Sequence, residues 1–153
     1  YRLPQELVDT KQQLEQLGFK VTIEATDPGG WAKKVSDFDF DLTMNFLYQY
    51  ADPAIGVTRN YVSTNIIKGT PFGNNHGYSN PEVDRLLGAA PLLKGADARQ
   101  RMYSEAQRIL VDEVAVGYLV EMQYATLYRT KVHNLVTTGI GLNETLDNVW
   151  IAK

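Results

Sequence analysis

The chain has 153 residues, of which 44% are hydrophobic and 22% are charged, the composition of one ordinary globular domain. Lysine and arginine number 15 against 18 aspartates and glutamates, so the formal charge is −3 and the basic face that a nucleic-acid binder needs is not expected. The absence of cysteine excludes a disulfide scaffold, thiolate catalysis and iron–sulfur clusters.

The first third of the chain predicts two helices and two strands. Leucines recur at helical spacing up to Gly18, which is suited to end a helix. Alternating apolar residues predict a strand with one buried face over 19–25, and Asp27 is placed to cap a short helix after it. Alternation returns over 38–46 and predicts a second strand. This order favours an α/β fold with crossover connections.

The middle of the chain predicts an irregular binding loop. Pro53 suits the first position of a helical turn, with Asp52 before it. From 58 to 78 the chain is polar and rich in residues that break regular structure. Loops of this length in compact domains are usually binding loops or disordered.

Two helices and a set of short strands complete the prediction. Pro81 begins one helix, with Ser79 or Asn80 as its cap, and Asp97 is expected to cap the next. Their predicted apolar faces consist of Val83, Leu86, Leu87 and Ala90, and of Met102, Ala106, Ile109 and Leu110. Alternation over 114–122 predicts a further strand, and the tail predicts short strands and turns up to 149–151.

A calcium site is not expected, although Asp37, Asp39 and Asp41 have the spacing that opens a calcium-binding loop. Such a loop also needs a glycine at its sixth position and a glutamate at its twelfth. Leu42 and Tyr48 occupy those positions. We therefore interpret the three aspartates as a solvated surface and predict no metal site.

No catalytic residue is predicted. The two histidines, His76 and His133, lie in separate segments, and none of the four serines lies in the G-x-S-x-G pattern of a nucleophile elbow. No glycine-rich phosphate loop is present, so no nucleotide cofactor is expected. His76 lies in the irregular loop and is kept as a candidate ligand contact.

The segment 45–53 is the strongest candidate for binding a ligand. Its aromatic and amide side chains gather where the predicted second strand ends, and ligands of open α/β sheets bind outside the carboxyl ends of strands. Aromatic faces supply rigid apolar area, and amides and hydroxyls orient polar groups. The alternative is that Phe46, on the same face as Met44, only packs the core.

Five stretches together resemble the C-terminal part of the dipeptide, oligopeptide and nickel class (family 5) of extracellular solute-binding proteins. They are GFKV at 18–21, DFDFDL at 37–42, DP at 52–53, YSNPEVDRLL at 78–87 and RQRMYSEAQRIL at 99–110. The order and spacing agree over nearly the whole chain. The resemblance implies a periplasmic-binding-protein-like (type II) lobe, a mixed sheet flanked by helices, as part of a two-lobe protein.

The same resemblance implies how such a protein works. Residues 1–122 would supply mostly the second lobe, and strands in 123–153 would return to the first lobe. The two lobes would close on a peptide-like or other small polar solute and deliver it to the permease subunits of an ABC importer. The protein would be periplasmic or lipid-anchored at the cell surface, without a cofactor, and would meet the membrane only through the permease or through an N-terminal anchor outside this chain.

The resemblance also implies a ligand site. Peptide-binding relatives carry an aspartate for the ligand's amino terminus and a pocket tryptophan at the positions of Gln49 and Phe46. Gln49 has no charge to offer an ammonium group, so a sugar conjugate or an opine-like ligand is expected to fit better than a peptide with a free amino terminus. The predicted ligand contacts are Phe46, Gln49, Tyr50, Asn45, His76 and Arg59.

Two other classes of function stay open on the sequence alone. One is an enzyme domain, such as a hydrolase that uses His76. The other is a structural or interaction domain without a small ligand. Exposed strand edges over 116–122 and in the tail are expected to favour association with other chains.

Overall fold

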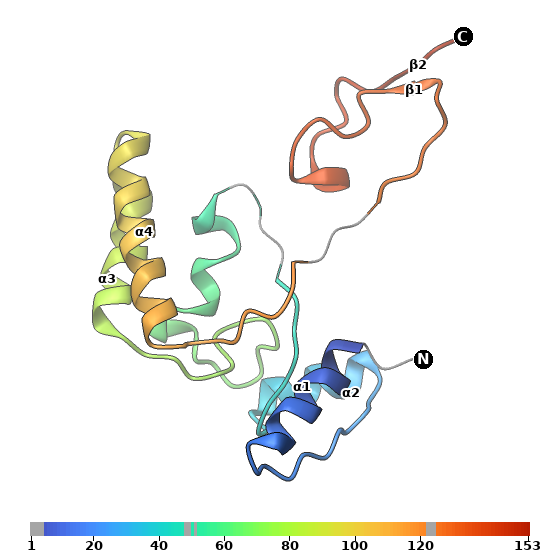
Figure 1. Cartoon of the computed structure of the whole chain (residues 1–153). Coiled ribbons are helices and arrows are strands. Elements are labelled where there is room, and N and C mark those ends of the chain that lie inside the picture. The colour runs from blue at the N-terminus through green and yellow to red at the C-terminus, as the bar shows by residue number, and fades with distance from the viewer. Residues whose placement is uncertain (1–4, 48–49, 51, 122–124) are drawn as a thin grey trace.

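The computed structural model describes residues 5–47, 50, 52–121 and 125–153, and these residues fall into three regions along the chain (Figure 1). The first holds α1 (Gln5–Gln16) and α2 (Pro28–Asp37). The second holds α3 (Pro81–Ala89) and α4 (Ala96–Asp112), with short 3-10 helices around them. The third holds the strands β1 (Val132–His133) and β2 (Trp150–Ile151).

The first helix ends, and the second begins, where the sequence predicts. Gly18 takes a left-handed φ of +92° just after α1, as expected of a residue that ends a helix. The Asp27 carboxylate accepts a hydrogen bond of 2.8 Å from the Gly30 amide and caps α2, which confirms that prediction. Neither helix is deeply packed: α1 has no buried residue, and Val35 is the one buried residue of α2.

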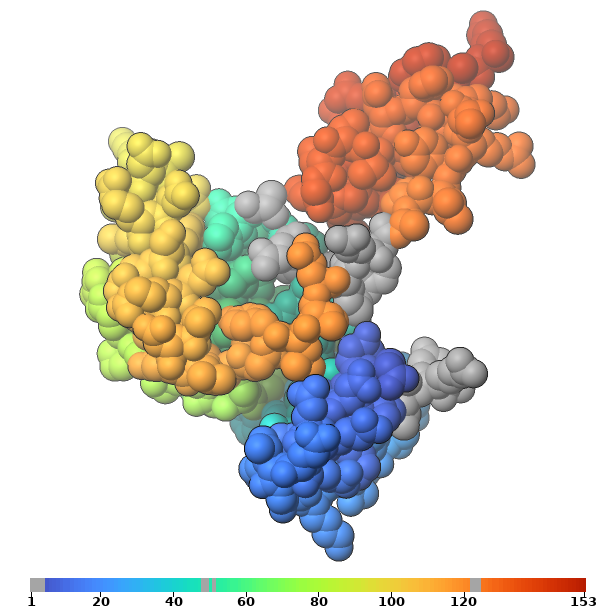
Figure 2. Space-filling model, in the orientation of Figure 1, coloured from blue at the N-terminus to red at the C-terminus, as the bar shows by residue number. Residues whose placement is uncertain are grey.

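The core of the second region lies between α3 and α4. Asn80 caps α3 by accepting hydrogen bonds from the Glu82 and Val83 amides, so the second of the two candidate caps is the one used. The buried cluster consists of Tyr61, Val83, Leu86, Leu87, Ala106 and Leu110, and Met102 and Ile109 pack against it. These helix faces are the predicted ones. Figure 2 shows the same region as one continuous body.

The predicted cap of α4 is wrong. The helix begins at Ala96, after Gly95, whose φ is +102°. Asp97 therefore lies inside the first turn. Its carboxylate interacts favourably with the positive end of the helix dipole there, but it does not cap the helix. The 3-10 helix Ala90–Leu92 follows α3, and Gly95 is the residue from which the chain enters α4.

The irregular segment over 58–78 is ordered by a buried amide. The 3-10 helix Pro53–Ile55 precedes this segment, and the 3-10 helices Thr58–Asn60 and Ser63–Asn65 lie within it. Asn74 is 0% exposed, and its amide donates to the carbonyls of Val62 and Tyr78 while its oxygen accepts from the Tyr78 amide. Side-chain hydrogen bonds thus replace the backbone ladders that this segment lacks.

The three long strands predicted over 19–25, 38–46 and 114–122 are wrong for the residues that the structure describes. These stretches are not in strands, and Val114 has a φ of +51°, outside the extended region. An alternating pattern selects a face, whereas a strand also needs a neighbour to share its hydrogen bonds. No described segment pairs with these stretches, so the predicted α/β layering with crossovers is not formed.

The tail forms short strands and turns, as predicted. β1 and β2 pair antiparallel, with Val132 opposite Ile151 and His133 opposite Trp150. The rings of His133 and Trp150 stack with centroids 4.0 Å apart. His133 is thereby accounted for by packing. The described helices include none that is both long and apolar enough to cross a bilayer.

Candidate functional site

The predicted ligand segment leaves an aromatic ring at the surface. Phe46 is 54% exposed, and its amide donates a hydrogen bond of 2.8 Å to the Asn45 side chain. Tyr50 is half-buried. Gln49, the residue on which the ligand prediction depends, lies outside the described residues. The alternative that Phe46 is sealed in the core is not what the structure shows.

The end of this segment is fixed by an ion pair. Asp52 Oδ2 lies 2.5 Å from Nη2 of Arg99 on α4, and Oδ1 accepts a hydrogen bond of 3.0 Å from the Ala54 amide. The guanidinium and then the amide hold the pKa of Asp52 below its usual value. The Arg99 guanidinium in turn lies 5.8 Å from the centre of the Tyr103 ring.

His76 and Arg59 lie in the second region of the chain. The His76 ring is 6.0 Å from the ring of Tyr61 and 6.4 Å from that of Tyr78, and partial burial lowers its pKa. Arg59 is exposed, and its carbonyl accepts a hydrogen bond from Asn65. The contacts of this pair run to Tyr61, Tyr78 and Asn65, within the second region, and a site shared with residues 45–50 stays a prediction.

A set of polar contacts around α3 and α4 is not predicted by any pattern in the sequence. The hydroxyls of Tyr61 and Tyr118 are 2.8 Å apart, and the Tyr78 hydroxyl donates to Glu113 Oε2 at 2.5 Å. Burial, followed by the contact with Glu113, raises the pKa of Tyr78 to about 12. The partners are 57 and 35 residues apart, and no local pattern in the sequence links them.

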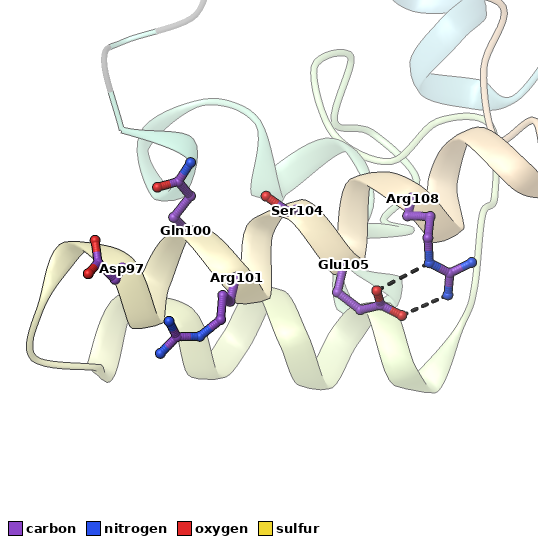
Figure 3. Close-up of a pocket in the computed structure, with 6 residues that line it drawn as sticks. All are labelled: Asp97, Gln100, Arg101, Ser104, Glu105 and Arg108. Carbon is purple, nitrogen blue, oxygen red and sulfur yellow. Dashed lines mark hydrogen bonds and ion pairs between the residues drawn. The ribbon is translucent and has the colours of Figure 1, made fainter.

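Two surface hollows lie elsewhere. One runs along the exposed face of α4, where Arg108 bonds Glu105 (Figure 3). Its lining residues are Asp97, Gln100, Arg101, Ser104, Glu105 and Arg108. The other lies in the tail around Glu144, whose carboxylate is occupied by Thr137. Neither contains a predicted ligand contact, and the described residues contain no group of three metal-ligating side chains.

Comparison with known proteins gives one informative relative. The chain is 32% identical over 128 residues to the probable D,D-dipeptide-binding periplasmic protein DdpA of Escherichia coli (strain K12). The match covers 83% of this chain and 24% of that protein, so the chain spans about a quarter of the length of the relative. No family model matches the chain, and no solved structure matches it.

Proposed function

Because the chain is a C-terminal part of an extracellular solute-binding protein of the dipeptide, oligopeptide and nickel class, we propose that it helps to capture a small peptide-like solute in the periplasm. The solute then passes to the permease of an ABC importer. The observation that carries this proposal is the similarity to a D,D-dipeptide-binding protein over 83% of the chain. The mainly helical structure with one small sheet is compatible with part of such a fold.

The segment 45–50 forms one wall of the ligand site in this proposal. The ring of Phe46, which is more than half exposed, supplies an apolar wall, and the Asn45 side chain accepts a hydrogen bond from the Phe46 amide. Gln49 and Tyr50 orient the polar groups of the ligand. His76 and Arg59, in the second region of the chain, are secondary contacts in this proposal.

Capture works by closure rather than by chemistry. A ligand that contacts both lobes binds the closed form more tightly than the open form and shifts the population toward closure. Residues 1–122 supply mostly one lobe, and residues 123–153 supply strands that return to the other. No bond is broken, so the protein needs no catalytic base, and the relative is a binding protein.

The uncharged amide of Gln49 narrows the ligand class. A carboxylate at this position would hold an ammonium group with a charge-assisted hydrogen bond, about twice as strong as a neutral one. A glutamine instead accommodates a neutral amide or hydroxyl. The proposed ligand is therefore a solute whose group at this point is uncharged, such as a blocked peptide, a sugar conjugate or an opine-like compound.

A pair of probes tests the proposal in the whole protein. D-alanyl-D-alanine carries a free amino group, and its N-acetyl derivative carries a neutral amide. Saturation of a true ligand at 100 times its Kd adds about 2.7 kcal/mol to stability, which a thermal-shift panel detects. We expect the wild type to prefer the acetylated probe, and Gln49→Asp to prefer the free one. Unchanged preference in the variant would contradict the role of Gln49.

The hydrolase alternative receives no support from the described residues. No hydrogen bond there links His76 to a serine or to a carboxylate, the arrangement that an activated nucleophile requires. Incubation of the whole protein with both probes should leave them intact by mass spectrometry. Cleavage that disappears in His76→Ala would instead favour an enzyme.

A further inference from the structure

We propose that Arg99 is a positioning residue for the ligand segment: it holds Asp52, and through Asp52 and its bond to Tyr50 it fixes the end of that segment relative to α4. This inference rests on the proposed function, because it gives the segment its binding role. It adds a residue that contacts no ligand itself.

The geometry joins two parts of the chain that are 47 residues apart. Arg99 lies at the end of the first turn of α4, and its Nη2 is 2.5 Å from Asp52 Oδ2. Both side chains are 31% exposed, so water reaches the pair only in part. Partial shielding from water strengthens a charge-assisted hydrogen bond compared with one at the open surface.

Asp52 uses its two carboxylate oxygens in different directions. Oδ1 accepts from the Ala54 amide and starts the 3-10 helix Pro53–Ile55, while Oδ2 binds Arg99. The Asp52 amide also donates to the Tyr50 carbonyl at 2.7 Å. The carboxylate therefore stands at the junction between the ligand segment and the ordered loop, and a change in its partner is transmitted to residue 50.

Arg99 is itself held in place from α4. The ring of Tyr103, one turn further along the helix, lies 5.8 Å from its guanidinium carbon. A cation above an aromatic face is attracted to it, so the ring limits the positions that the guanidinium takes. The pair thus fixes the segment to a helix that packs on the buried cluster, rather than to another loop.

The other ion pairs among the described residues join residues that are much closer together along the chain. They join residues ten or fewer positions apart, and most of them lie within one helix. Arg108 provides a matched control, because it makes two ion pairs on the same helix, with Glu105 and Asp112, and is 59% exposed. Breaking those pairs leaves Asp52 untouched.

The test compares Arg99→Gln and Arg108→Gln in the whole protein by hydrogen–deuterium exchange. We expect Arg99→Gln to raise the exchange rate of the amides in 45–52 by about tenfold through local opening, with α3 unchanged. Arg108→Gln should leave 45–52 as in the wild type. Arg99→Lys, which keeps the charge, should restore part of the protection, and Asp52→Asn should reproduce the loss if Arg99→Gln does not fold.

Binding of N-acetyl-D-alanyl-D-alanine supplies the second readout. Arg99→Gln should weaken its affinity by about fivefold or more, while Arg108→Gln keeps the wild-type affinity. Unchanged exchange in 45–52 for both Arg99→Gln and Asp52→Asn would overturn the positioning role. If the wild type binds neither probe, the proposed ligand class fails, and the exchange data still decide the role of Arg99.

Discussion

Asn74 is expected to be worth more to the stability of this protein than any exposed ion pair. Replacing it by alanine removes three hydrogen bonds, to the Val62 carbonyl at 3.1 Å and to the Tyr78 carbonyl and amide at 2.7 and 3.1 Å. Each intramolecular hydrogen bond contributes about 1 kcal/mol, and buried partners left unpaired add to the loss. The free energy of unfolding should therefore fall by about 3 kcal/mol.

The neighbouring Asn75 is the matched control. It is a partly exposed asparagine whose side chain donates to the Thr70 carbonyl at 2.7 Å and, over a longer 3.4 Å, to the Val35 carbonyl, and water can replace the bond to Thr70. Asn75→Ala should cost about 1 kcal/mol or less. Urea unfolding of both variants, followed by circular dichroism, measures the difference. Equal losses for the two variants, or a loss below 1 kcal/mol for Asn74→Ala, would refute the reasoning that a buried side chain orders this loop.

Three further results are expected. Val83→Ala, at a position that is 0% exposed, should lower the free energy of unfolding by about 2 kcal/mol, from two lost methyl groups and the cavity they leave, whereas Val111→Ala, at 53% exposed, should change it by about 0.5 or less in the same urea experiment. Equal values would show that the cluster around Val83 is not close-packed. The pKa of Glu113 is lowered, so its contribution to stability is complete above pH 4.5, its ordinary value, and is lost as the pH falls through the lowered pKa. The pKa of Tyr78 is raised from 10.0 to about 12, so its contribution is complete below pH 10.0 and is lost as the pH rises toward 12. Glu113→Gln should flatten the acid side of the thermal-melting profile, and an ultraviolet titration should find one phenol that ionises near pH 12; a wild-type acid profile in Glu113→Gln would count against the contact. Phe46→Ala should weaken binding of N-acetyl-D-alanyl-D-alanine by about fivefold or more in calorimetry without lowering the melting temperature, and undiminished affinity would remove this ring from the proposed site.

Local rules predicted the helices well, because a helix is specified by residues close to one another. Asp27 and Asn80 cap the helices that follow them, and Gly18 ends the first one. The predicted start of α4 differs from the observed one because Gly95, at a φ of +102°, turns the chain into the helix two residues before Asp97. The capping preference of Asp97 is therefore not used.

Strands and the site depend on partners that a local pattern does not name. The alternation over 19–25 and 38–46 is real, but the described residues give these stretches no neighbour to pair with. In the same way, the segment 45–53 is predicted from the sequence, but the ion pair between its Asp52 and Arg99, 47 residues later, is not. The exposure of Phe46 agrees with a role at the surface, and the part played by Gln49 stays a prediction.

The two ends of the α3–α4 hairpin differ in how much variation they can absorb. At one end the chain enters at Tyr78 and leaves at Glu113, whose carboxylate accepts hydrogen bonds from Tyr78 at 2.5 Å and from Asn80 at 2.8 Å. At the other end Leu92 is 83% exposed, and no such side-chain hydrogen bond ties the turn together among the described contacts. Natural insertions and engineered tags are therefore best accommodated between Leu92 and Gly95, where extra length leaves the entrance and exit of the hairpin in register.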